Sequence, residues 1–139
     1  MKIVIDTNIL ISALRSRKGA SFRLFSLIQK KRFMPILSLP LFLEYEEVVH
    51  REVQKGIFPF EKGEMLLDFI SYHFEHQELH YRWRPMLNDP KDEMVLETLL
   101  NSRSEYLITY NKKDFLNVKE LKNRILDAKE FLQLIGDIR

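Results

Sequence analysis

The chain opens on a short run of apolar, β-branched residues that stops at a carboxylate. Ile3, Val4 and Ile5 lack the polar alternation of a half-exposed strand, and Asp6 follows them directly. Such a run is typical of a strand buried on both faces, which occurs in parallel sheets that carry helices on either side. The run therefore predicts an α/β fold in which Asp6 stands at the carboxyl edge of the sheet.

The rest of the sequence alternates between helix-like and strand-like segments. Helical spacing is expected over residues 7–15, 20 to about 32, 38 to about 55, 61–80, 89 to about 100 and 129–135, with strands over 33–37, 106–109 and 125–126. This order predicts a three-layer α/β/α sandwich with a central parallel sheet. Since no repeat or linker interrupts it, residues 1–139 are expected to form a single domain. Ligands of such sheets bind outside the carboxyl ends of the strands, where the strand order reverses.

The composition excludes several classes of protein. There is no cysteine, so zinc sites built on thiolates, thiol nucleophiles and disulfide scaffolds are ruled out. No apolar run approaches the ~20 residues that a membrane span requires, and the first apolar run is too short for the core of a signal peptide. We therefore expect a cytoplasmic location and no membrane partner.

Basic residues are concentrated in the first part of the chain. Residues 1–43 hold eight bases against one acid, a net charge of +7, whereas residues 44–139 hold 14 bases against 19 acids, a net charge of −5. Basic surfaces bind polyanions largely because neutralised phosphates release counterions, so this segregation fits contact with a nucleic-acid backbone. Charge alone fits a solvated helix face equally well. The residues expected to follow the backbone are Arg15, Arg17, Lys18 and Arg23.

Four acidic residues are expected near the carboxyl edge of the sheet. Asp6 closes the first strand, Glu44 lies on the apolar face of its helix, Asp92 lies in a first helical turn, and Asp114 follows the strand over 106–109. Taken singly, Asp6 also fits an N-cap, Glu44 a rim residue or arginine partner, and Asp92 a residue that favours the helix dipole. Gathered on one edge, carboxylates repel unless a hard cation lies among them, and oxygen ligands indicate Mg²⁺ or Mn²⁺.

At these positions the sequence resembles the PIN-domain ribonucleases, and among them the prokaryotic type described as toxin components of toxin–antitoxin pairs. The resemblance covers nearly the whole chain and implies an α/β/α sandwich whose carboxylates bind Mg²⁺ or Mn²⁺ and cleave single-stranded RNA. The segments that carry it, in the right order, are Ile3–Leu10, Ser38–Tyr45, Asp89–Glu93, Tyr106–Thr109 and Asn111–Phe115.

The resemblance also implies roles for individual residues. Asp6, Glu44 and Asp92 match the first three acids of the family motif. At the fourth position many relatives have Asp where this chain has Asn111, while others have Asn there and an acid three residues later, as Asp114 stands here. Asn111 can still ligate through its carbonyl oxygen or orient a water. The polar positions that orient the carboxylates in the family correspond to Thr7, Asn8, Thr109 and Asn111.

The stretch over 57–83 is rich in Phe, Tyr, Met and His, and relatives are often homodimers or bound by an antitoxin. We expect part of this stretch to be an interface, with a second copy or a cognate antitoxin as partner. His73, His76 and His80 have helical spacing but not the His-Glu-x-x-His pattern of zinc proteases, and are interpreted as a polar helix face. Arg82–Arg84 is interpreted as an interfacial Trp between cations rather than as a base-stacking site.

The main interpretation is therefore a metal-dependent endoribonuclease, the toxin of a toxin–antitoxin pair. The alternative keeps the fold without the activity, as an RNA- or protein-binding module with a degenerate metal site, and Asn111 is its best support. A phosphatase with Asp6 as nucleophile is disfavoured, because Asn8 replaces the second Asp of an Asp-x-Asp motif and no glycine-rich phosphate loop follows.

Overall fold

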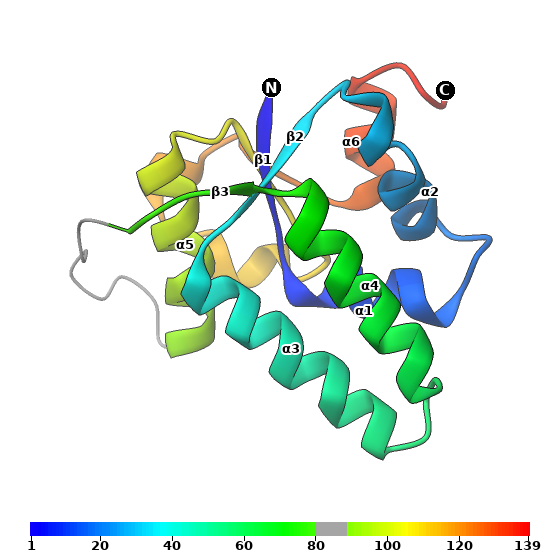
Figure 1. Cartoon of the computed structure of the whole chain (residues 1–139). Helices are drawn as coiled ribbons and strands as arrows, with labels where there is room; N and C mark the ends of the chain where they lie inside the picture. The colour runs from blue at the N-terminus through cyan, green and yellow to red at the C-terminus, as the bar shows by residue number, and fades with distance from the viewer. Residues whose placement is uncertain (80–88) are drawn as a thin grey trace.

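Five parallel strands form the centre of the protein, in the order β3-β2-β1-β4-β5 (Figure 1). The computed structural model describes residues 1–79 and 89–139. The α/β/α sandwich and the parallel sheet are as the sequence predicts. The strands are β1 (Lys2–Ile5), β2 (Met34–Leu37), β3 (Glu75–His76), β4 (Tyr106–Ile108) and β5 (Ile125–Leu126).

The central strand is the apolar run with which the sequence opens. β1 pairs with β2 on one side, Ile3 opposite Pro35, and with β4 on the other, Val4 opposite Leu107. Because it has neighbours on both edges and helices on both faces, the side chains of Ile3, Val4 and Ile5 are fully buried. The strand order reverses between β1 and β4, so the carboxyl ends of these two strands mark the place where such a fold binds its ligand.

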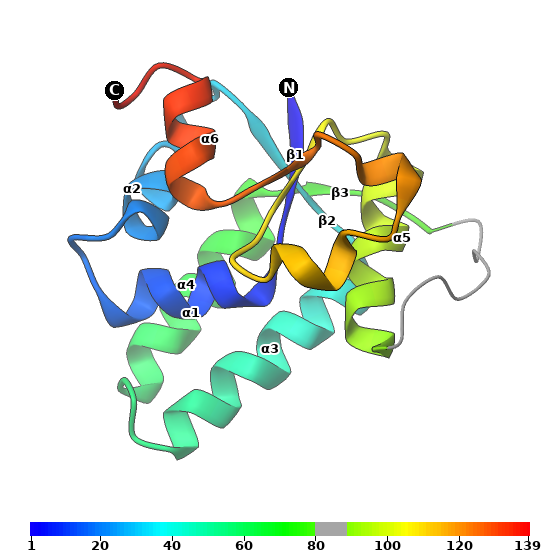
Figure 2. The same ribbon diagram turned by 180° about the vertical axis from the view of Figure 1, so that it is seen from behind.

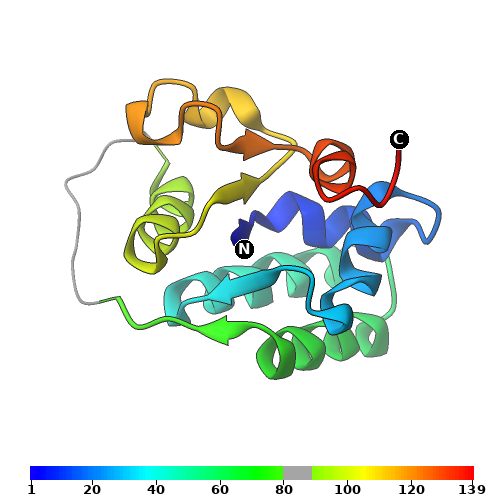
Figure 3. The same cartoon turned by 90° about the horizontal axis from the view of Figure 1, so that it is seen from above.

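Helices cover both faces of the sheet. α5 lies on one side, and α2 and α6 lie together on the other (Figures 1 and 3). α3 leaves the carboxyl end of β2, and α4 runs back beside it (Figure 2). The helices are α1 (Thr7–Arg15), α2 (Ala20–Ser26), α3 (Leu39–Gln54), α4 (Phe60–His73), α5 (Pro90–Ser102) and α6 (Ala128–Leu134), with 3₁₀ turns at Ile28–Lys30, Lys112–Phe115 and Lys119–Leu121.

Several of these helices begin where the sequence places a capping side chain. The carboxylate of Asp6 accepts a hydrogen bond from the first amide of α1, Ser38 accepts one from an amide of α3, and Asp89 accepts one from the second amide of α5. Pro90 occupies the first position of α5, as its fixed φ favours. Both Asp6 and the N-terminus of α5 are thereby fixed next to the sheet edge.

The helix expected over 61–80 is wrong at its C-terminal end. α4 stops at His73, the buried ring of Phe74 packs against Phe25, and β3 then pairs with β2. A two-residue edge strand with both residues exposed has no apolar alternation, so the pattern could not reveal it. His73 and His76 therefore share no helix face, and His80 and Arg82–Arg84 lie outside the described residues.

The second predicted helix is shorter than expected near residues 30–32. α2 ends at Ser26, a 3₁₀ turn over Ile28–Lys30 follows, and Lys31 adopts the left-handed conformation at φ 57°. The apolar positions of a 3₁₀ turn continue those of a helix closely enough that the sequence does not separate them. The basic residues at 30–32 therefore form the turn into β2 instead of the last turn of a helix.

Candidate active site

A cavity of about 560 Å³ opens at the carboxyl edge of the sheet. All four predicted carboxylates line it, although they come from four separate segments. Asp6 follows β1, Glu44 comes from α3, Asp92 from the first turn of α5, and Asp114 from the 3₁₀ turn after β4. Thr7, Asn8, Asn111 and Arg15 from the predicted set also contribute to its wall.

Asp6 is held by three donors. Its carboxylate accepts hydrogen bonds from the Thr7 amide at 2.8 Å, from the Thr109 hydroxyl at 2.8 Å and from the Asn8 side-chain amide at 3.3 Å. Its side chain is nearly buried, so these donors replace the water that a charged group would otherwise lose. Asp6 therefore caps the N-terminus of α1 and also lines the cavity, so its interpretation as an N-cap and its interpretation as a site residue are compatible.

Thr109 ties the ends of β1 and β4 together. Its hydroxyl donates to Asp6 and accepts from the Asn8 amide at 3.1 Å and from the Asn111 backbone amide at 3.0 Å. The Asn8 oxygen in turn accepts from the Tyr110 amide at 3.0 Å. Each donor in this network is matched to an acceptor. The hydrogen bonds therefore fix the orientation of the Asp6 carboxylate before any ligand binds.

Two of the four carboxylates, Asp6 and Asp92, have a raised pKa. Burial, and then the charge of Asp114, raises the pKa of Asp6 against the lowering effect of its hydrogen bonds from Thr109 and Thr7. Burial, and then the charges of Asp6, Asp114, Asp89 and Glu93, raises the pKa of Asp92 to about 6. The cavity therefore concentrates negative charge that a cation would neutralise.

Glu44 has a different environment. Its side chain is only 6% exposed, and the Lys91 ammonium group lies 3.5 Å from its Oε1 atom. Among residues 1–79 and 89–139, Lys91 is the only basic side chain within ion-pair distance of any of the four carboxylates. Sequence reasoning missed Lys91, because the contact joins α5 to α3 and no local pattern reports it.

Other residues of the cavity could have been found from the sequence. Arg51 and Glu52 also line it, seven and eight residues beyond Glu44 in α3. Residues at this spacing share a helix face, so extending the periodicity from Glu44 would have identified both. Their charged groups have partners on the helix itself, Arg51 with Glu47 at 3.2 Å and Glu52 with Lys55 at 3.8 Å.

The donor chemistry at this edge suits a hard divalent ion. Within the described part of the chain, no three His, Asp or Glu side chains are grouped so that they could hold one ion between them. Mg²⁺ in proteins commonly keeps several waters and takes only one or two carboxylates, so pairs drawn from Asp6, Glu44, Asp92 and Asp114 meet its requirements. The residues present therefore fit the metal that the family resemblance implies.

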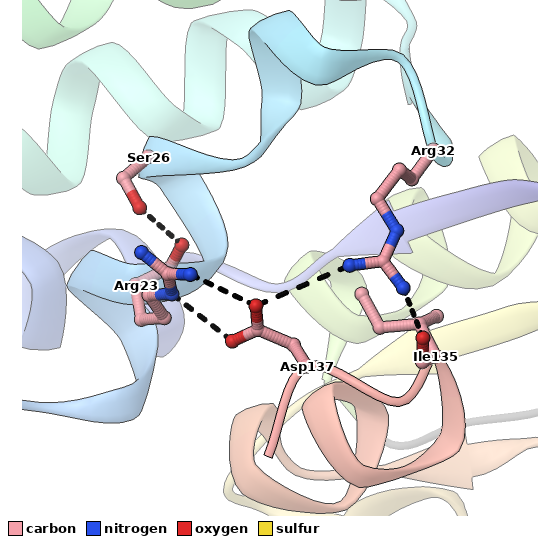
Figure 4. Close-up of polar contacts among 5 residues, drawn as sticks. All are labelled: Arg23, Ser26, Arg32, Ile135 and Asp137. Carbon is pink, nitrogen blue, oxygen red and sulfur yellow. Dashed lines mark hydrogen bonds and ion pairs between the residues drawn. The ribbon is translucent and has the colours of Figure 1, made fainter.

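Of the four predicted backbone-binding residues, only Arg15 lines the cavity. Arg15 lines the cavity, whereas Arg17 lines a separate apolar groove and Lys18 is exposed in the loop after α1. Arg23 donates two hydrogen bonds to the carboxylate of Asp137, at 3.0 and 2.9 Å (Figure 4). The guanidinium group of Arg23 is thereby engaged within the fold.

Comparison with known proteins identifies the fold family. The sequence matches the family model described as PIN domain over residues 2–113, most of the chain. The chain belongs to the PIN domain family. The match includes Asn111 and ends one residue before Asp114. No curated protein matches the sequence.

A solved structure shares the fold of this PIN domain. It is described as VapBC2 from Rickettsia felis bound to a DNA fragment from their promoter. The alignment has a TM-score of 0.61 and 18% identity, and covers 91% of this chain and 98% of the other. Among the described residues, no helix is long and apolar enough to cross a membrane.

Proposed function

We propose that this PIN domain is a metal-dependent endoribonuclease that hydrolyses phosphodiester bonds of single-stranded RNA. One observation carries the proposal: four carboxylates from four separate segments share one cavity at the point where the strand order reverses. Burial and neighbouring negative charge raise the pKa of Asp6 and Asp92, which is unfavourable for the fold alone and is typical of a functional site.

A pair of carboxylates drawn from Asp6, Glu44, Asp92 and Asp114 would hold Mg²⁺ or Mn²⁺, with water as the remaining ligands. The ion, when bound, supplies a Lewis acid that offsets charge on phosphate oxygens and lowers the pKa of a coordinated water. Asp6 is the best-positioned ligand, because three hydrogen bonds fix its carboxylate. Asp114 is exposed at the cavity and free to accept a proton from the attacking water, whereas Glu44 is paired with Lys91.

The positions of the basic side chains support a proposed substrate path. Arg15 contributes to the cavity wall, and Arg17 and Lys18 are exposed just beyond it in sequence. We propose that these residues contact successive phosphates of a single strand, a sequence-independent interaction that weakens with salt. Arg23 belongs to the proposed set with a smaller share, because Asp137 engages its guanidinium group.

A partner surface is proposed on α1, α2 and α4. A groove of about 510 Å³ there is mostly apolar, with Phe22, Met65 and Leu66 among its lining residues, and Met65 is 72% exposed. We propose that this chain is the toxin of a toxin–antitoxin pair and a homodimer, with part of the stretch over 57–79 in an interface. Light scattering at micromolar concentration measures whether the chain is a homodimer. A strictly monomeric chain for which no partner is found would contradict the proposed interface.

The decisive experiment is cleavage of end-labelled single-stranded RNA with Mg²⁺, with Mn²⁺ and with EDTA. We compare the native chain with Asp6→Asn, and use Glu52→Gln as the matched control, since it removes a negative charge from the same cavity outside the cluster. Cleavage that needs metal, is lost in Asp6→Asn and persists in Glu52→Gln supports the proposal. RNA binding without cleavage in either metal would favour the degenerate binding module.

A further inference from the structure

The proposed chemistry gives no role to Lys91, which pairs with Glu44 at the cavity. Glu44 is a nearly buried carboxylate on α3, and the ammonium group of Lys91 reaches it from the first turn of α5, with 3.5 Å between Nζ and Oε1. A buried carboxylate that stays ionised needs a partner, since desolvation otherwise costs more than the fold can offset. In the metal-free protein Lys91 supplies that partner.

The two partners differ in how firmly they are held. The side chain of Lys91 is 44% exposed against 6% for Glu44, so the lysine can leave toward solvent while the carboxylate stays in place. An ammonium group on a flexible four-carbon stem is strongly hydrated, so it gains hydration when it leaves. Glu44 is therefore an anion that stays in place, and Lys91 is a cation that can move away from it into solvent.

A divalent ion and Lys91 compete for the same oxygen atoms. An ion bound among these carboxylates brings two positive charges next to the ammonium group, which raises the energy of any state that holds both. Resting on the proposed metal centre, we propose that Lys91 is a built-in counter-ion: it occupies Glu44 when the site is empty and is displaced when a divalent ion binds. Lys91 thus stabilises the metal-free fold and lowers the affinity of the site for metal.

The test is direct binding of Mn²⁺ to the full chain, by calorimetry and by the electron paramagnetic resonance signal of free Mn²⁺. Lys91→Met is expected to bind Mn²⁺ about tenfold more tightly than the native chain. The matched control is Arg51→Met, which also removes a positive charge from the cavity but whose partner is Glu47. It is expected to change the affinity by less than about twofold.

Thermal unfolding provides a second readout that does not depend on activity. In EDTA, Lys91→Met is expected to unfold at a lower temperature than the native chain, because Glu44 loses its partner. In saturating Mn²⁺ this difference should disappear. In a Glu44→Gln background, Lys91→Met should tighten Mn²⁺ binding much less, since the carboxylate with which Lys91 pairs has been removed.

The outcomes separate this inference from the proposed function. If Lys91→Met binds Mn²⁺ no more tightly than the native chain, or no more tightly than Arg51→Met, Lys91 is not a counter-ion, even where the native chain binds Mn²⁺ and cleaves RNA. If neither the native chain nor Lys91→Met binds Mn²⁺, both the metal centre and the counter-ion are wrong. Tightening in Lys91→Met alone supports the inference whether or not RNA is cleaved.

Discussion

The carboxylates of the cavity and the carboxylate of Asp137 have opposite surroundings. In the cavity, Asp6 and Asp92 stand among other acids, and burial and like charge raise the pKa of both. At the C-terminal end of the chain, Asp137 accepts two hydrogen bonds from Arg23 and lies 4.0 Å from Arg32, so that the pKa of its carboxyl is lowered (Figure 4). The same functional group is unfavourably placed in one region and favourably placed in the other.

The difference shows which region serves the fold and which serves function. Arg23 holds Asp137 to α2, and Arg32, in the turn before β2, donates a hydrogen bond to the backbone oxygen of Ile135, so the end of the chain is held without any ligand. The cavity does the reverse, because it accumulates negative charge that only an added cation neutralises fully. A region that weakens the fold in the absence of a ligand is expected to bind one.

The largest effect is expected from removing the hydroxyl that orients Asp6. Thr109→Val keeps the shape of a fully buried side chain but leaves Asp6, Asn8 and the Asn111 amide without the oxygen they contact. We expect the free energy of unfolding to fall by about 2 kcal/mol and RNA cleavage to slow at least ~tenfold. Chemical denaturation and the cleavage assay measure the two effects.

Thr109→Ser is the control for this change, because it retains the hydroxyl and loses one methyl group. It should restore most of the cleavage rate. Equal losses in the two variants would show that Thr109 acts through packing and that its hydrogen bond to Asp6 is unimportant.

A pair of matched substitutions then tests the comparison itself. Asp114→Asn removes one of the like charges that raise the pKa of Asp6 and Asp92, so the metal-free protein should melt higher, by about 2 °C. Asp137→Asn removes a charge that Arg23 and Arg32 surround, so the melting temperature should fall. Differential scanning calorimetry in EDTA checks both. Shifts of the same sign would refute the contrast between the two regions.

The sequence predicted the cavity better than it predicted the C-terminal contacts, for a physical reason. Asp6, Glu44 and Asp92 are placed by local features: the end of an apolar strand, the apolar face of a helix and a first helical turn. These features need only short-range geometry and the rule that parallel strands end at one edge. Arg23 and Asp137 are separated by 114 residues, and no periodicity connects them.

The same limit explains the remaining differences. β3 was missed because a two-residue exposed edge strand has no pattern of its own, and it forms only because β2 offers it an edge. Lys91 was missed because its role depends on a helix that lies far away in sequence. Local signals therefore located the carboxylates, whereas the contact of Lys91 with Glu44 required the tertiary structure.

The pH dependence of the free energy of unfolding should also distinguish the cavity from the C-terminal contacts. The expected effect is smaller than that of the preceding substitutions. The pKa of Asp92, about 6, lies above its ordinary value of 3.8, so the folded protein takes up this proton more readily than the unfolded chain. Asp92 therefore weakens the metal-free fold above about pH 6, and this penalty is relieved as the pH falls from about 6 toward 3.8. The lowered pKa of Asp137 acts oppositely, since its stabilisation is lost only as the pH falls below 3.8.

Denaturation in EDTA at about pH 7 and pH 5 measures this prediction. The native chain should gain roughly 1 kcal/mol relative to Asp92→Asn between the two, after allowance for the partial exposure of Asp92. Parallel pH profiles for the native chain and Asp92→Asn would show that the carboxylates of the cavity do not disfavour the metal-free fold.

The smallest effect concerns Arg15 and Arg23. The sequence predicts backbone contact for both, but their surroundings in the structure differ. Arg15 lines the cavity, whereas Arg23 is engaged by Asp137. In an Asp6→Asn background that prevents cleavage, Arg15→Gln should weaken binding of single-stranded RNA about threefold and reduce its salt dependence, because one phosphate contact is lost. Arg23→Gln should lower the melting temperature and weaken RNA binding less than Arg15→Gln does. Fluorescence anisotropy over a range of salt concentrations measures both, and equal losses of affinity would place Arg23 on the RNA path despite its contacts with Asp137.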